Sequence, residues 1–251
     1  MHVMLSNDDG IDAAGLHSLR RTLAEARPDW KLSVVAPDRE QSASSHSLTL
    51  TRPLRIEERG ERAWAVSGTP TDCVLVGYES ILEGDPPDAL ISGINHGPNL
   101  GEDVHYSGTV AAAFEGRLLD MPAVALSLGS RKLHFAGAEE FIRRFLVPWL
   151  EEGLPNNTLL NINIPSGDFE SIRGIRPCRL GSRRYQDVVV RKEDPRGRPY
   201  FWIGGDQRTI TPDPDTDLVL VSEGWISVTP LRIDLTDHEG LAALERFNAS
   251  W

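Results

Sequence analysis

The opening of the chain is the sequence feature that most limits its fold. His2 to Ser6 is a short apolar run of the kind that forms a buried strand. A segment with leucines at helical spacing follows from Gly15 to Arg27, and a second apolar run spans Leu32 to Ala36. A strand, a helix and a second strand in this order predict parallel pairing through a right-handed crossover. We therefore expect an α/β fold with a mostly parallel sheet flanked by helices.

Two adjacent carboxylates lie where the first strand ends, in Asn7-Asp8-Asp9-Gly10. Neighbouring side chains on a regular strand point to opposite faces, so Asp8 and Asp9 converge on one ligand only if the backbone turns, which Gly10 permits. Ligands bind in the crevice outside the carboxyl ends of strands in open α/β sheets. A carboxylate pair there repels itself unless a cation or a shared proton is present. This segment therefore predicts a divalent metal site, and a solvated turn is the alternative interpretation.

Two further polar loops are expected at the same edge of the sheet. Residues 37–47 follow the second strand and contain four serines, which is longer than a simple connection requires. Residues 92–109 are rich in glycine and asparagine and end in Ser107-Gly108-Thr109 before a helical run. Ser107 is a natural N-cap, and the small residues beside it leave backbone N–H groups open to a phosphate. The glycine spacing fits neither a P-loop nor the dinucleotide fingerprint. A flexible surface loop and a structural helix entry are the respective alternatives.

The remaining core follows the same alternation of short apolar runs and helical segments. Thr69 is expected to cap a helix that begins at Pro70, with Asp72 in a capping role. We expect a hairpin formed by Leu48 to Ile56 and Ala63 to Ser67, and a long helix from Gly137 to Glu152. Further strands are expected at Asp88 to Ser92, Ala123 to Leu128 and Leu159 to Ile164.

The pattern changes after Pro165. Strand-like runs at Val188 to Val190 and Tyr200 to Ile203 flank an Asp194-Pro195-Arg196-Gly197 turn, which predicts a long hairpin. A protruding hairpin would offer its edges and aromatic side chains to a second subunit, so we interpret it as an oligomerisation arm. A hairpin folded back on its own sheet is the alternative. We expect residues 1–165 to form the catalytic core and residues 166–251 to contribute this C-terminal arm, a strand and a helix that complete the core and the oligomer.

The last segments are two short apolar runs, Leu218 to Val221 and Trp225 to Pro230, and a helix from Asp237 to Phe247.

Charge and cysteine content narrow the class of partner. The 251-residue chain has a formal net charge of -11, which argues against a nucleic acid polymer or an anionic membrane as partner. An anionic substrate would need a metal ion or backbone N–H groups for local positive charge. Cys73 and Cys178 are interpreted as packed thiols and fit a reduced cytoplasm. With neither a membrane-spanning run nor a signal peptide in the sequence, we expect a cytoplasmic protein.

Taken together, the motifs resemble the SurE family of survival-protein nucleotidases. The matching segments are Ser6 to Gly10, Val35 to Ser42, Gly68 to Val74, Ser92 to Asn95, Tyr106 to Ala112, Asp194 to Gly197 and Ser227 to Leu231. The resemblance implies a Rossmann-like core and C-terminal elements exchanged within a homodimer or homotetramer. It also implies metal-dependent hydrolysis of nucleoside 5′- and 3′-monophosphates, with activity on short polyphosphate. One departure is Ala14, where the family commonly has proline, and it puts no ligand in doubt.

The resemblance also assigns residues. It implies that Asp8 and Asp9 are catalytic, that Asp8, Asp9, Ser42 and Asn95 bind one divalent metal ion per subunit, and that phosphate lies near Asn7, Asn99, Ser107, Gly108 and Thr109. All four ligands are oxygen donors, which suits Mg²⁺ or Mn²⁺, with Ca²⁺ as an alternative in crystals. Hydrolysis would then proceed by attack of metal-bound water on phosphorus.

Four alternatives accompany this hypothesis: a covalent route, two roles for loop histidines, a sensor and an oxidoreductase. The contiguous Asp8 and Asp9 do not form the Asp-x-Asp pair of haloacid-dehalogenase-type phosphatases, so a covalent route is disfavoured. His96 and His105 are alternative proton donors or surface groups. A non-catalytic sensor of a phosphorylated metabolite would use the same residues, whereas a nicotinamide-dependent oxidoreductase would need a glycine fingerprint that the sequence lacks.

Overall fold

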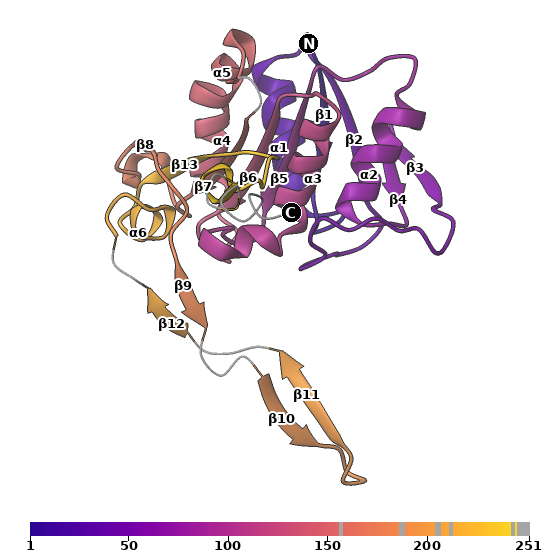
Figure 1. Ribbon diagram of the computed structural model, residues 1–251. Helices are drawn as coiled ribbons and strands as arrows, with labels where there is room; N and C mark the ends of the chain where they lie inside the picture. Colours follow the sequence, from indigo (N-terminus) through magenta and orange to yellow (C-terminus); the bar gives the residue numbers. More distant parts are fainter. Residues whose placement is uncertain (156–157, 186–188, 204–206, 211–212, 242–243, 245–251) are drawn as a thin grey trace.

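The protein, described here from a computed structural model covering residues 1–155, 158–185, 189–203, 207–210, 213–241 and 244, is built on one large sheet (Figure 1). Nine strands pair in the order β3-β4-β2-β1-β5-β6-β7-β13-β8. Their bounds are β1 His2–Ser6, β2 Lys31–Pro37, β3 Ile56–Gly60, β4 Ala63–Val66, β5 Ala89–Asn95, β6 Ala123–Leu128, β7 Leu159–Ile164, β8 Ile175–Pro177 and β13 Ile226–Leu231. The pairs β3–β4 and β7–β13 are antiparallel and the other neighbours are parallel, which confirms the mostly parallel α/β fold.

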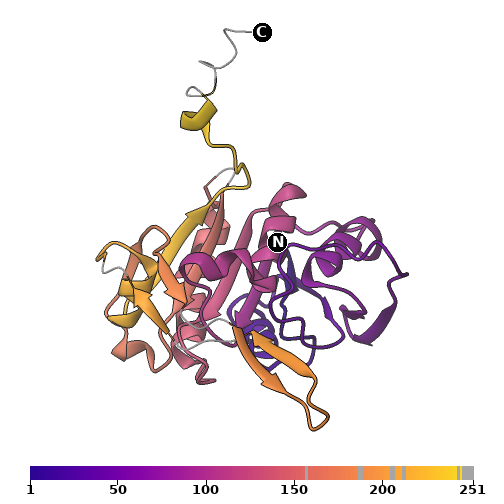
Figure 2. The same ribbon diagram turned by 60° about the horizontal axis from the view of Figure 1, so that its bottom comes forward.

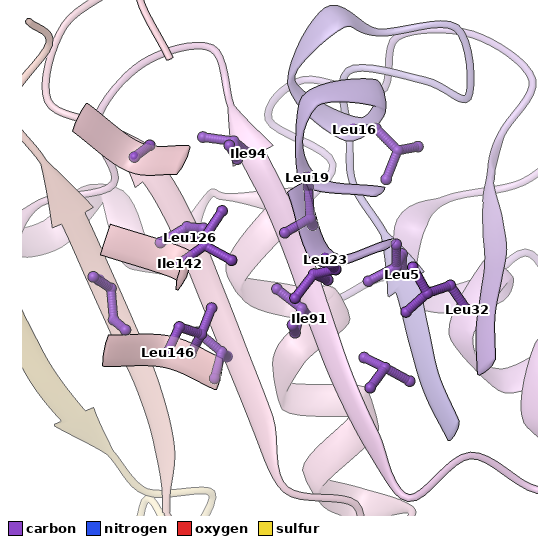
Figure 3. Packing of buried hydrophobic residues seen from close by; sticks show 14 of the residues in the cluster. Leu5, Leu16, Leu19, Leu23, Leu32, Ile91, Ile94, Leu126, Ile142 and Leu146 are labelled. Atoms are coloured by element: carbon purple, nitrogen blue, oxygen red, sulfur yellow. The ribbon is translucent and has the colours of Figure 1, made fainter. Parts of the chain in front are cut away.

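Helices cover both faces of this sheet. Successive side chains of β1 alternate between two hydrophobic clusters, with Val3 and Leu5 in one and Met4 in the other. The first cluster is closed by α1 (Ala14–Ala26) and by the continuous helical segment of α4 (Ala136–Phe141), η3 (Ile142–Leu146) and α5 (Val147–Glu152). Figure 3 shows Leu19 and Leu23 of α1 meeting the strand residue Ile91 there. The second cluster lies under α2 (Pro70–Val76), η1 (Gly77–Ile81) and α3 (Gly108–Leu118).

The strand order reverses beside β1, and this position defines the ligand crevice. From β1 the chain passes to β2 on one side, whereas β5 returns on the other side. Helix α1, which follows β1, approaches β5 very closely here, because a Cβ atom at Gly15 would lie 1.9 Å from the carbonyl oxygen of Ile94. Such a switch point is where open α/β sheets bind ligands.

The C-terminal region forms an arm that projects from the core (Figures 1 and 2). Strand β9 (Arg183–Tyr185) pairs with β12 (Gln207–Ile210), and further out β10 (Val189–Glu193) pairs with β11 (Pro199–Ile203). The outer hairpin carries exposed apolar side chains, including Phe201, Trp202 and Ile203. The predicted hairpin is therefore confirmed and the folded-back alternative is wrong. Strand β13, from the same C-terminal region, inserts between β7 and β8 of the core sheet.

Two expectations about local structure need correction or restriction, and one apolar run can be assigned to a helix. The first strand of the N-terminal hairpin is Ile56–Gly60, whereas residues 48–55 form a loop. Leu50 is 86% exposed and Pro53 has no N–H to donate, so the alternation in this stretch does not reflect a buried ladder. The run Leu218 to Val221 lies in helix α6 (Asp217–Ser222). In the expected helix 237–247, residues 238–241 and 244 are helical and the rest is either non-helical or outside the described residues.

The other helix and strand predictions agree with the structure to within a few residues. Short helical turns also occur at η2 (Gly101–His105) and η4 (Phe169–Ser171). Among the described helices, none has the length and apolar character needed to cross a bilayer.

Candidate functional site

Asp8 is a buried carboxylate at the carboxyl end of β1. Its side chain is 5% exposed and accepts a hydrogen bond from the Thr109 hydroxyl at the start of α3. Burial raises the pKa of Asp8 to about 6; the Thr109 hydrogen bond opposes this rise in pKa and the neighbouring Asp9 charge adds to it. The protein alone therefore stabilises the negative charge of an ionised Asp8 poorly. A bound cation would supply the missing positive charge.

Asp9 is held by the other side of the crevice. Its Oδ2 accepts the backbone N–H of His96 at 3.0 Å, and its Oδ1 lies 3.6 Å from His96 Nδ1. Burial raises the pKa of Asp9, and the neighbouring His96, which also donates its backbone N–H to this carboxylate, opposes that rise. His96 Nε2 accepts the backbone N–H of Gly15 at 3.2 Å, so a neutral His96 carries its proton on Nδ1, toward Asp9. His96 thus positions Asp9, whereas the His105 side chain is exposed at the end of η2.

Asn95 reaches the same point from β5. The register between β5 and β6 shifts between Ser92 and Asn95, a local irregularity of the kind that re-aims side chains at strand ends. The Asn95 amide donates to the carbonyl oxygen of Gly97 at 2.9 Å, and its Oδ1 lies 3.3 Å from Thr109 Oγ1. The Thr109 hydroxyl, which donates to Asp8, therefore lies between the carboxylate that follows β1 and the amide at the end of β5.

The start of α3 packs directly against this carboxylate. Ser107 Oγ accepts the backbone N–H of Val110 at 3.1 Å, which confirms the predicted N-cap. A Cβ atom at Gly108 would lie 2.6 Å from Ser44 Oγ and 2.8 Å from Asp8 Cβ, so only glycine fits at position 108. Backbone N–H groups at this helix start therefore lie beside Asp8, in a position suited to an anion.

Asn7 supports the turn that presents the carboxylates. It is fully buried, and its amide donates to the carbonyl oxygen of Gly10 at 2.9 Å. Within the described part of the chain its Oδ1 has no hydrogen-bond partner, and neither has the buried Ser44 Oγ. Of these two oxygens, Ser44 Oγ packs with Asp8 against Gly108, and an unpartnered polar oxygen there is consistent with a polar ligand at this place.

Asn99 has a different environment from the other phosphate candidates. Its side-chain amide donates to Ser127 Oγ at 2.8 Å, and its backbone N–H donates to Asn163 Oδ1 at 2.8 Å. Its carbonyl oxygen accepts the side-chain amides of Asn161 and Asn163 at 2.9 and 3.0 Å. These bonds fasten the loop after β5 onto β6 and β7.

Ser42 lies beside the carboxylates, with its hydroxyl turned elsewhere. The side chain is exposed and its Oγ donates to Glu40 Oε1 at 2.6 Å. The adjacent backbone N–H of Gln41 donates to the Asp8 carbonyl oxygen at 2.7 Å, which holds this loop against the end of β1. The structure therefore brings together Asp8, Asp9, Asn95, Thr109 and Gly108, with Ser42 on the adjoining loop.

Sequence reasoning missed the side chains that hold these loops. His46 Nε2 lies 2.8 Å from Glu115 Oε2 on α3, which ties the serine-rich loop to that helix. The buried Asp217 at the start of α6 accepts the backbone N–H groups of Gly101 at 2.9 Å and Gly181 at 2.7 Å. A Thr-Asp pair before an apolar run was the available signal for Asp217, but it indicates only a local cap.

The donor set favours a hard cation. Among the described residues, no cluster of three or more histidine, cysteine, aspartate or glutamate side chains is arranged to hold a metal. Two carboxylates with neutral amide and hydroxyl oxygens instead suit Mg²⁺ or Mn²⁺ that retains water ligands. Cys73 is buried and burial raises its thiol pKa, so it is a packed thiol, as predicted.

Comparison with known proteins points to a single family, the SurE proteins. The sequence profile of "Survival protein SurE" matches residues 3–187. The chain is 43% identical over 247 residues to a 5′-nucleotidase SurE of Vibrio cholerae serotype O1, covering 98% of this chain and 97% of that protein. It is 50% identical over 248 residues to the 5′-nucleotidase SurE of Gemmatimonas aurantiaca, covering 96% of each chain.

A solved structure shares the whole architecture. The crystal structure of the SurE protein from Aquifex aeolicus superposes with a TM-score of 0.87 at 40% sequence identity, covering 99% of this chain and 100% of that one. The similarity therefore extends over the site loops and the C-terminal arm.

Proposed function

The chain belongs to the survival protein SurE family, and from that premise we propose that it is a metal-dependent phosphomonoesterase acting on nucleoside monophosphates. The names of its relatives support a hydrolase of the 5′-nucleotidase type. The observation that carries the proposal is the convergence of Asp8, Asp9 and Asn95 at the carboxyl ends of β1 and β5.

The oxygen donors define where the cation would be held. Asp8, Asp9 and Asn95 supply three donors, and Ser42 would supply the fourth after its hydroxyl turns from Glu40. Water and a phosphate oxygen would complete the coordination. When bound, the divalent cation would lower the pKa of water and neutralise charge on the phosphoryl oxygens.

The protein's own groups provide the remaining functions. Asp8 and Asp9 would accept a proton from the attacking water. The backbone N–H groups at the start of α3, beside Ser107, Gly108 and Thr109, would stabilise developing negative charge on the phosphate. Asn7 would contact it through its unpartnered oxygen only by way of water, since that atom is an acceptor.

We extend the proposal to substrates and assembly. Nucleoside 3′-monophosphates and short polyphosphate present the same terminal phosphate group, so the same residues serve them. The exposed apolar residues of β10 and β11 favour association through this hairpin into a homodimer or homotetramer. Replacing Trp202 and Phe201 with serine should lower the molecular mass measured by light scattering, and an unchanged mass would contradict this assignment.

The test of the activity is phosphate release from nucleoside 5′- and 3′-monophosphates and tripolyphosphate, with Mn²⁺, Mg²⁺ or EDTA. We expect release that depends on metal and falls by at least about a hundredfold in Asp8→Ala. Asp12→Ala, an exposed aspartate of the same loop, is the matched control and should retain activity. Metal-dependent nucleotide binding without release on any substrate would contradict the phosphatase and leave the sensor.

A further inference from the structure

The loop after β6, residues 129–135, lies against the candidate site. The Arg131 side chain packs on Gly97, where an added Cβ atom would lie 3.6 Å from Arg131 Cγ. Gly97 is the residue whose carbonyl oxygen accepts the Asn95 amide. From the same loop, the Phe135 ring lies 6.1 Å from the His96 ring, and His96 holds Asp9. This loop therefore contacts two consecutive residues that position the proposed metal ligands.

The same loop carries two free positive charges. Arg131 and Lys132 are exposed, and in the described part of the chain neither takes part in an ion pair. The nearby Asp168 is paired with His134 at 3.2 Å. Most other arginines that the structure describes lie within 4 Å of a carboxylate, as Arg143 does with Glu25 at 2.9 Å. Arg131 and Lys132 thus place two adjacent positive charges on the loop that contacts Gly97 and His96, in a chain whose formal net charge is -11.

A phosphate dianion approaching this site meets negative charge first. Asp8 and Asp9 lie at the centre of the site, and the charge of Glu40 on the neighbouring loop also acts on Asp9. A cation bound by Asp8 and Asp9 would offset their negative charge where the reacting phosphate lies, but not where further phosphate groups of a longer substrate would lie. Positive side chains on the rim raise the local concentration of an anionic substrate, and the attraction grows with substrate charge and weakens with salt.

We propose that Arg131 and Lys132 form a cationic rim that attracts the substrate and binds phosphate groups beyond the reacting one, so that they set the preference for substrates with more than one phosphate. This inference rests on the proposed phosphatase function. It assigns the two side chains a role in substrate capture. The reacting phosphate would still be bound by the metal ion and by the backbone N–H groups at the start of α3.

The test compares Arg131→Gln/Lys132→Gln with Lys192→Gln/Arg196→Gln, which removes the same charge from the exposed hairpin. With Mn²⁺ at low salt, we expect kcat/KM of the rim variant to fall about threefold to tenfold on a nucleoside monophosphate and further on tripolyphosphate, with kcat unchanged. The loss should vanish near 1 M NaCl, where the Debye length is about 3 Å. The hairpin control should match the wild type at every salt concentration.

The outcomes separate the two proposals. Wild-type release with an equal kcat/KM in the rim variant, or an equal loss in the hairpin control, would overturn the rim while leaving the phosphatase intact. If the wild type releases no phosphate, calorimetric titration of tripolyphosphate with Mn²⁺ still tests the rim. A salt-sensitive loss of affinity in the rim variant alone supports it, and equal affinities overturn it.

Discussion

Replacing Asp8 with asparagine should make the metal-free protein more stable while removing its activity. In the folded state burial raises the pKa of Asp8 from 3.8 to about 6. The folded protein therefore binds this proton more tightly than the unfolded chain does, and stability falls as the pH rises from about 4 through 6. The full difference corresponds to about 3 kcal/mol above pH 7, since one pKa unit is about 1.4 kcal/mol. Asparagine keeps an oxygen that can accept the Thr109 hydrogen bond and carries no charge.

The measurement is thermal unfolding in EDTA between pH 4 and pH 8. Each kcal/mol shifts the melting temperature of a domain of this size by roughly 2–4 °C, so Asp8→Asn should melt about 6–12 °C above the wild type at pH 8. The gap should close toward pH 4, and saturating Mn²⁺ in place of EDTA should stabilise the wild type but not Asp8→Asn. Asp12→Asn is the control and should show no gap. A variant that melts at or below the wild type at pH 8, or a gap independent of pH, would refute the reasoning.

Three further substitutions test other contacts. Gly15→Ala places a Cβ atom 1.9 Å from the Ile94 carbonyl oxygen, so we expect a loss of at least about 3 kcal/mol in urea unfolding, and a loss under 1 kcal/mol would contradict the close packing. Thr109→Val removes the hydrogen bond that lowers the pKa of Asp8, so in EDTA the loss of stability with rising pH should extend to higher pH than in the wild type, whereas Thr109→Ser should leave it in place. Asp217→Asn replaces one carboxylate oxygen with an NH₂ donor, so one of the backbone N–H groups of Gly101 and Gly181 loses its acceptor, and we expect about 2–3 kcal/mol of destabilisation; an unchanged denaturant midpoint would argue against an anchoring role.

The core elements could be predicted from the sequence because their signals are local. Alternating apolar runs and helical leucine spacing located β1, α1 and β2, and the Thr69 capping box located the start of α2. The strand at residues 48–56 was misplaced for the same reason, since alternation alone does not reveal whether a face is buried. Leu50 fits the alternation of apolar and polar residues in Leu48 to Thr51, yet its side chain is exposed.

The site was predictable at the level of loops and not of side-chain partners. The carboxyl ends of parallel strands meet at one edge, so the convergence of the Asp8 and Asn95 loops follows from topology. The hydrogen bonds of Thr109 to Asp8 and Asn95 depend on contacts between residues distant in sequence. The hydrogen bond of Ser42 to Glu40 depends on which rotamer the Ser42 side chain adopts. The sequence pattern contains no signal for such contacts, and the supporting pair of His46 and Glu115 was missed for that reason.

The seam between β1 and β5 also has a consequence for folding. Asp9 and His96 are 87 positions apart, and Asp8 and Thr109 are 101 positions apart, so local folding cannot create the site. Parallel pairing across such a separation carries a large loop-closure cost and forms late. Ligand affinity should therefore appear only when the central sheet has closed. A fragment that ends before β5 would keep the Asp8-Asp9 pair yet lack Asn95 and Thr109, and ligand added during refolding would report on the completed fold.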